Sequence, residues 1–182
     1  MATIISHPAV PLAIGLASGR RVISPRLLVV GVVCSVIPDL DVVAFHFDVP
    51  YAHQFGHRGF THSILFAVLV GLAGVGFHRW LQAQRHTVFL FLFASTVSHG
   101  ILDAMTTGGL GIAFLWPYEQ RYFLPWQFIQ VSPIGFSRFF SAWGAEVLKA
   151  EFIWIWLPTL IVGIFGLVAR TIRANTCEQA RH

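Results

Sequence analysis

Residues 57–80 read HRGFTHSILFAVLVGLAGVGFHRW, so a dense polar motif stands directly before a long apolar run. The motif holds two histidines, an arginine and two hydroxyl side chains, and the run that follows is almost entirely apolar. Polar side chains that can bind metal are costly at a membrane boundary unless they find partners. We therefore expect a membrane helix from His62 to about Trp80, capped by Thr61 and beginning beside a polar site.

The composition also indicates an integral membrane protein. Of the 182 residues, 55% are hydrophobic and only 11% are charged, whereas about 25% are charged in a typical soluble domain. The net charge of +4 comes from arginine, with Lys149 as the only lysine. Because the arginines cluster between apolar runs, they indicate membrane topology and not a nucleic-acid-binding surface. We expect one membrane-embedded domain over residues 1–174 and a polar, frayed cytoplasmic tail over 175–182.

Further apolar runs lie on both sides of the first. The run from Pro8 to Ser18 is too short to span a bilayer, and the run from Leu27 to Phe47 contains Pro38, which predicts a break there. Two more runs extend from Thr87 to Met105 and from Glu151 to Ala169. The fold class is therefore predicted as an all-α, multi-pass bundle with about four full spans plus a short N-terminal helix. The segment 106–150 is amphipathic and rich in aromatic residues, which favours the headgroup interface.

The positive charges divide between the two ends of the predicted bundle. If the spans alternate, one end carries Arg20, Arg21, Arg26, Arg79, Arg85, Arg170, Arg173 and Arg181, and the other carries Arg58, Arg121, Arg138 and Lys149. The positive-inside rule places the first group in the cytoplasm. The polar motifs then lie towards the extracytoplasmic face of a cytoplasmic membrane.

One polar motif ends the apolar run from Thr87 to Met105. His99 and Asp103 are four residues apart on a predicted helix, so they share a face and can bind one ion or one another. A simple hydrogen bond between packed helices explains the pair equally well. A metal site therefore needs further ligands from elsewhere in the chain.

Two other motifs can supply those ligands. Asp39 and Asp41 flank the break at Pro38, where the backbone can turn both carboxylates to one site, although one of them could simply cap the following turn. His57 and His62 are separated by Gly59, which permits a tight turn between the two imidazoles.

Three single residues complete the candidate site. His7 precedes the short N-terminal helix and is a possible further ligand. Arg58 is expected to hold an anionic substrate group, and Glu146 is a possible ligand or general base. Arg58 and Glu146 are thus the candidate catalytic residues. The candidate metal ligands are His7, Asp39, Asp41, His57, His62, His99 and Asp103.

The donor set predicts which metal the site would take. It contains imidazoles and carboxylates but no thiolate, which suits Zn²⁺ or Mn²⁺, and the number of candidates permits one or two ions. Paired metals activate water and stabilise the reacting oxygens in phosphoester cleavage. The chemistry of the site therefore favours hydrolysis.

The order of these motifs resembles a known family, the bacterial inner-membrane, membrane-bound metal-dependent hydrolases with LexA-regulated members. The resemblance runs through His7, PDLD at 38–41, GHRGFTHS at 56–63, HGILD at 99–103, Trp116-Pro117 and WGAE at 143–146. It implies a multi-pass hydrolase of the bacterial inner membrane. A looser similarity is to zinc-dependent phospholipase C, whose Asp, His, HxxxD and late Glu come in a similar order.

These observations together predict a hydrolase that cleaves a phosphoester or lipid-linked small molecule at the outer face of the membrane. Its expected partners are the lipid bilayer and that substrate, with no nucleic acid. Two alternatives stay open, a transporter or channel for protons or metal ions, and a structural membrane protein without catalysis. The oligomeric state and the substrate itself are left open by the sequence.

Overall fold

The computed structural model describes residues 1–132 and 140–179, and within these ranges every named element is a helix or a helical turn. Three helices are long and apolar enough to cross a membrane: Pro25–Phe47, Arg85–Ala104 and Ala142–Thr176. Two apolar helices, Ala9–Ser18 and Ile64–Gly76, are shorter. The all-α prediction is thus confirmed for the described residues, whereas the fourth full span is not.

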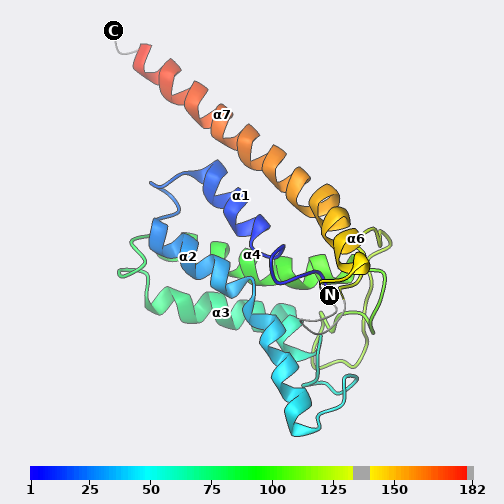
Figure 1. Cartoon of the computed structure of the whole chain (residues 1–182). Helices are drawn as coiled ribbons and strands as arrows, with labels where there is room; N and C mark the ends of the chain where they lie inside the picture. Colours follow the sequence, from blue (N-terminus) through cyan, green and yellow to red (C-terminus); the bar gives the residue numbers. More distant parts are fainter. Residues whose placement is uncertain (133–139, 180–182) are drawn as a thin grey trace.

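The first long helix is broken where proline predicts it. α1 (Ala9–Ser18) leads through a loop to α2 (Pro25–Cys34), whose N-cap Ser24 accepts a hydrogen bond from the Leu27 amide at 3.1 Å. The α-helix stops before Pro38, and a 3₁₀-helix, η1 (Ile37–Phe47), continues the chain in a different direction (Figure 1). Runs of 3₁₀-helix this long are uncommon and often mark functional sites.

The next helix begins and ends inside its predicted limits. α3 (Ile64–Gly76) is capped by Ser63, whose Oγ accepts from the Phe66 amide at 3.0 Å. The prediction that Thr61 is the cap was therefore wrong. Thr61 lies in the preceding 3₁₀ turn, η2 (Phe60–His62), and its hydroxyl donates to the Asp41 carboxylate at 2.8 Å.

α3 packs along α4 (Arg85–Ala104) through its glycines. A Cβ atom on Gly71 would lie 2.9 Å from the Phe89 ring, and one on Gly74 would lie 2.3 Å from a Leu92 methyl group. Such small residues let two membrane helices approach closely. The close packing places the last turn of α4 beside the start of α3.

The last helix is longer at both ends than predicted. α6 (Ala142–Glu151), a π-helical turn η3 (Phe152–Trp156) and α7 (Leu157–Gln179) follow one another without a break. The predicted start at Glu151 was therefore wrong, and residues 175–179 of the predicted tail are helical. Arg138 and Arg181 lie outside the described residues.

The two ends of the bundle differ in character (Figure 1). The loops 19–24 and 77–84 lie at one end, and η1, η2 and the irregular segment 105–132 lie at the other. Between α2 and α4, an apolar core of buried residues fills the half nearer the first end: Ile23, Leu27, Cys34, Leu81, Val88, Phe91 and Leu92. α7 packs on α1, with Gly166 against Ala17.

The irregular segment covers the other end of the bundle. Its backbone pairs with itself at two points, Thr106 with Ile129 and Ile112 with Tyr122, and both isoleucines are fully buried. Residues 106–132 of the predicted interfacial segment therefore form a folded cover over the polar residues below them.

Candidate metal centre

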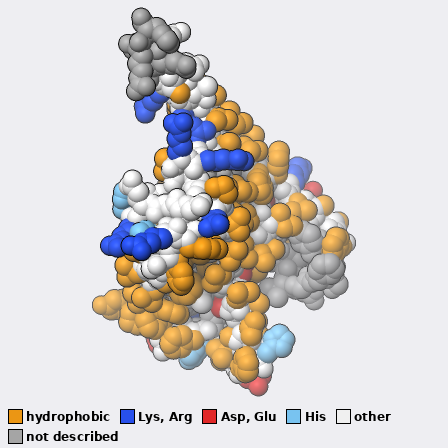
Figure 2. All heavy atoms as spheres, turned by 90° about the vertical axis from the view of Figure 1, so that its left-hand side faces the viewer, with side chains coloured by type: hydrophobic (Ala, Val, Ile, Leu, Met, Phe, Trp, Pro, Cys, Tyr) orange, Lys and Arg blue, Asp and Glu red, His pale blue; other side chains and the backbone are white. Residues whose placement is uncertain are grey.

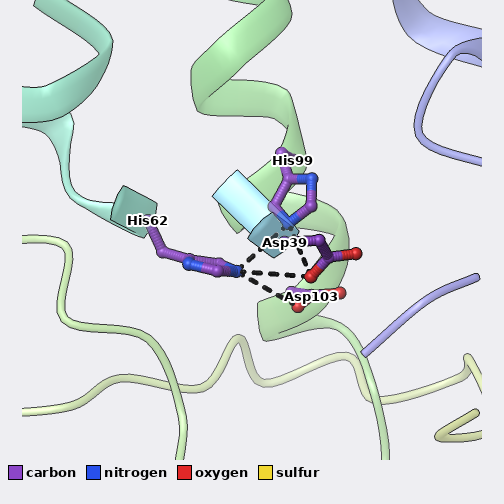
Figure 3. Close-up of side chains that lie close together, drawn as sticks. All are labelled: Asp39, His62, His99 and Asp103. Atoms are coloured by element: carbon purple, nitrogen blue, oxygen red, sulfur yellow. Dashed lines mark hydrogen bonds and ion pairs between the residues drawn. The ribbon is translucent and has the colours of Figure 1, made fainter. Parts of the chain in front are cut away.

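Four side chains from three separate elements meet beneath this cover (Figure 3). Asp39 comes from η1, His62 from η2, and His99 and Asp103 from the last turns of α4. All four are buried, and each offers a ligand atom within 4.8 Å of the others. The fold thus joins the three motifs of the sequence in one place.

Hydrogen bonds on the outer side of each imidazole fix which nitrogen faces the centre. The Nδ1–H of His99 donates to the Ser35 carbonyl at 2.8 Å. Because the Thr61 hydroxyl donates to Asp41, its oxygen is left to accept from Nδ1 of His62 at 3.1 Å. When both imidazoles are neutral, as in a metal-bound state, both Nε2 atoms therefore point inward as lone pairs, only 3.1 Å apart. Two facing lone pairs at that distance need a cation or a shared proton between them.

Three carboxylate oxygens of the group also lack a hydrogen bond. Both oxygens of Asp39 and the Oδ2 atom of Asp103 are buried without a hydrogen bond from any described residue. Among the described residues, Arg58 is the only fully buried arginine or lysine. Arg58 lies beside Asp103, so Asp39 has no arginine or lysine partner among the described residues. A buried carboxylate without a cation costs several kcal/mol, so an additional positive charge would stabilise this group.

The distances fit a tetrahedral metal ion. Ligands at about 2.0–2.1 Å from Zn²⁺ lie about 3.3 Å from one another. Here His99 Nε2 is 3.4 Å from Asp39 Oδ1, and His62 Nε2 is 3.7 Å from Asp103 Oδ2 and 3.9 Å from Asp39 Oδ1. Asp39, His62, His99 and Asp103 could therefore hold a divalent ion after shifts of a few tenths of an ångström.

His7 closes the centre on the side of the N-terminal segment. Its ring stacks on that of His99 with centroids 3.7 Å apart, and its Nε2 lies 3.8 Å from Asp39 Oδ2 and 3.7 Å from Asp103 Oδ1. Burial, together with the neighbouring His99, lowers the pKa of His7 to about 3, so the imidazole is neutral and can bind metal. His7 thus faces Asp39 Oδ2 and Asp103 Oδ1, the carboxylate oxygens that point away from His62. A second ion could bind between His7 and these two oxygens.

Asp41 and His57 lie behind His62 and not in the group of four. The Nδ1–H of His57 donates to Asp41 Oδ1 at 2.6 Å, while Asp41 Oδ2 lies 3.2 Å from His62 Nδ1. A carboxylate behind a ligating histidine fixes its tautomer and raises its basicity. Asp41 therefore supports the candidate ligand His62, although Asp41, His57 and His62 also form a second group with metal-ligand spacing.

Arg58 is fully buried, and its guanidinium group faces the protein. It donates to the Gly108 carbonyl at 2.8 Å and to Thr106 Oγ1 at 3.0 Å, and its Nε is 3.5 Å from Asp103 Oδ2. The prediction that Arg58 holds a substrate anion has no support in this geometry. Its position beside Asp103 makes it a positioning residue for a ligand.

The turn between His57 and His62 depends on Gly59 for a different reason from the one predicted. Arg58, and not Gly59, has a positive φ, of 65°. Gly59 is needed because a Cβ there would lie 2.3 Å from the Gln54 carbonyl oxygen. A strained, non-glycine backbone at a buried polar site is typical of functional regions.

Glu146 is not brought to the centre. It is largely exposed on α6, 4.0 Å from Lys149. The acidic residue that the helix does bring inward is Glu151, which is fully buried and was not recognised in the sequence. Glu151 accepts hydrogen bonds from the Thr3 amide, the Thr3 hydroxyl and, at 2.7 Å, the Ser6 hydroxyl. It therefore anchors the segment that carries His7.

Without metal, the stability of the protein is expected to fall at alkaline pH. Burial alone lowers the pKa of His62, but hydrogen bonds and charge interactions with Asp103 and Asp41 outweigh burial and raise it to about 9 from an ordinary 6.5. A raised pKa adds stability below pH 6.5, and this stability is lost as the pH rises through 9. Thermal unfolding in detergent with a chelator would measure the loss, and His62→Gln should reduce it. If the two proteins lost the same thermal stability as the pH was raised, the expectation would be contradicted.

The helices and the buried histidine–aspartate group define a multi-pass α-helical protein of the membrane with a candidate metal centre. The chain belongs to the YdjM family, described as YdjM inner membrane protein, which it matches over residues 1–175. It is thus a protein of the bacterial inner membrane.

Individual relatives agree with this family. The chain is 47% identical to the inner membrane protein YbcI of Escherichia coli over 164 residues, which cover 89% of this chain and 95% of the relative. It is 34% identical to the inner membrane protein YdjM of Escherichia coli over 117 residues, or 60% of this chain and 51% of that relative. No solved structure matches the chain. The looser similarity to phospholipase C is not supported by these matches.

Proposed function

We propose that this protein is a membrane-bound, metal-dependent hydrolase that cleaves a phosphoester or lipid-linked substrate. The observation that carries the proposal is the convergence of Asp39, His62, His99 and Asp103, whose ligand atoms lie within 4.8 Å of one another and whose carboxylates include three oxygens without a hydrogen bond. A divalent ion, Zn²⁺ or Mn²⁺, would supply Lewis-acid activation of water and of a phosphoryl oxygen. His7 is the ligand through which a second ion would join.

The surrounding residues would keep this centre rigid. Asp41 orients His62, the Ser35 carbonyl orients His99, and Arg58 lies against Asp103. Such supporting contacts change metal affinity by about 10- to 100-fold when they are removed. The ligands are therefore held ready before substrate arrives.

We place the centre towards the extracytoplasmic face, where the substrate would be met. The loops with Arg20, Arg21, Arg79 and Arg85 lie at the opposite end of the bundle, and the positive-inside rule puts that end in the cytoplasm. In this arrangement α3 crosses beside α4 as the fourth span. Its 13 residues reach only about 20 Å, which requires thinning of the bilayer or burial of its ends.

The transporter alternative requires a polar path through the membrane. Beyond the centre, the space between α2 and α4 is filled by the apolar core around Leu27, Phe91 and Leu92. A closed apolar core on one side of a polar site favours a one-sided active site over a conduction path.

Hydrolysis assays on the purified protein test the proposal. We expect cleavage of a chromogenic phosphodiester or a phosphate-containing lipid that stops with a chelator and returns with Zn²⁺ or Mn²⁺. Asp39→Asn should reduce the rate by at least about 100-fold, while Glu119→Gln, an exposed acidic residue of the cover, should leave it unchanged. A protein that binds metal but cleaves none of these substrates would favour transport or a structural role.

A further inference from the structure

A second polar cavity lies at the opposite end of the bundle from the metal centre. Its volume is about 790 Å³, and it opens between the loop after α1, the loop after α3 and the first turn of α4. Its polar lining residues are Arg21, His78, Gln82, Gln84, Arg85, His86 and Thr87. None of them belongs to the centre described above.

The charge in this cavity is uncompensated. No aspartate or glutamate occurs in residues 1–38 or 49–102, so neither loop carries an acidic residue. Arg21 and Arg85 form no ion pair with any described residue, while Arg85 Nε donates to His78 Nε2 at 3.3 Å. Figure 2 shows the arginines and histidines of this end gathered on one face beside apolar surface. The cavity therefore carries a net positive charge with two guanidinium groups at its wall.

The start of α4 adds hydrogen-bond donors to the same cavity. Arg85, His86 and Thr87 form its first turn and line the cavity, and the Gln84 side chain does not cap the helix. The first amides of a helix have no intrahelical acceptor and bear the positive end of its dipole. A helix start of this kind binds phosphate readily, and here it stands beside two arginines.

We propose that this cavity binds a phosphate group, carried either by an anionic phospholipid of the cytoplasmic leaflet or by a soluble phosphate compound. Guanidinium groups match phosphate oxygens in a bidentate manner, and the cavity is large enough for a headgroup and not only for a free ion. Val22, which is exposed and apolar, lines the cavity, and the exposed Phe77 and Trp80 belong to the loop that forms one of its walls. Their position fits the acyl chains of a lipid whose headgroup enters the cavity.

Binding of defined ligands to the full chain in detergent tests the proposal. The probes are short-chain phosphatidylglycerol, short-chain phosphatidylethanolamine and inorganic phosphate, followed by native mass spectrometry and by thermal shift. Arg21→Gln with Arg85→Gln should weaken binding of the anionic probe at least about tenfold. The matched control, Arg20→Gln with Arg79→Gln, removes the same charge from exposed residues outside the lining. This control should bind as the wild type does.

A second variant separates loss of binding from loss of folding. Gln84→Glu is nearly isosteric, exposed and favourable at a helix N-terminus, so the protein should stay folded while the added carboxylate repels the anion. Phosphatidylglycerol binding in preference to phosphatidylethanolamine supports a lipid ligand, and binding of inorganic phosphate that excludes the lipid supports a soluble one. Equal weakening in the pocket and control variants would overturn the proposal, because it would show only general surface charge.

Discussion

Protein purified from membranes is expected to contain a stoichiometric divalent metal, and Asp39→Ala and His99→Ala are each expected to reduce it to a trace. Each substitution removes one of four converging ligand atoms and leaves the partners of that atom unsatisfied. Loss of a supporting contact alone costs about 10- to 100-fold in affinity, so loss of a ligand should exceed 100-fold. Elemental analysis of the purified proteins measures the effect, and titration with Zn²⁺ into the metal-free protein gives its size.

A graded series makes this result specific. Asp41→Asn should still bind the metal, but with an affinity lower by about 10- to 100-fold, because Asp41 orients His62 from behind. His46→Ala serves as the control, since His46 is an exposed histidine on the same 3₁₀-helix as Asp39. If wild type, Asp39→Ala and His99→Ala all contained the same trace of metal, the centre would have to be a proton-linked or purely structural cluster.

Much of the centre was predictable because its residues are polar where the chain is otherwise apolar. PDLD interrupts one apolar run, and His99 with Asp103 ends another, so each motif is conspicuous in sequence. The break near Pro38 follows from the chemistry of proline alone. The structure brings all seven predicted ligands to one end of the bundle, and their binding of metal stays a prediction.

Other features depend on contacts that no local pattern encodes. Ser63 and Thr61 both carry a hydroxyl that can cap a helix. The Thr61 hydroxyl instead donates to Asp41, which lies across the site. The contacts of Arg58 could not be predicted for the same reason, because its partners Thr106 and Gly108 come from a distant part of the chain. Local sequence identifies which residues are polar, and long-range packing decides what each one binds.

The choice between Glu146 and Glu151 shows this limit most clearly. The WGAE motif points to Glu146, but that residue faces outward beside Lys149. The contacts that bury Glu151 join residues 145 to 148 positions apart, Thr3 and Ser6, which sequence spacing cannot reveal. A π-helical turn follows Glu151 directly, and such turns often occur at functional sites.

Glu151→Ala is therefore expected to be among the most destabilising single changes in the chain. It leaves three buried donors without an acceptor, the Thr3 amide and the hydroxyls of Thr3 and Ser6. Each such group costs about 1–3 kcal/mol, so the free energy of unfolding should fall by at least about 3 kcal/mol. Thermal unfolding measures the loss, and hydrogen exchange should locate it in residues 2–7.

The same substitution tests whether the N-terminal segment belongs to the metal centre. His7 is held over Asp39 and Asp103 by this segment, so releasing the segment should weaken metal binding, though less than Asp39→Ala does. Glu146→Ala is the matched control on the same helix, and the loss of an exposed pair should change stability by no more than about 0.5 kcal/mol. If Glu146→Ala reduced stability and metal affinity more than Glu151→Ala does, Glu146 of the WGAE motif would be the functional acidic residue. If Glu151→Ala loosened residues 2–7 without changing metal affinity, the centre would consist of the four residues on η1, η2 and α4 alone, without His7.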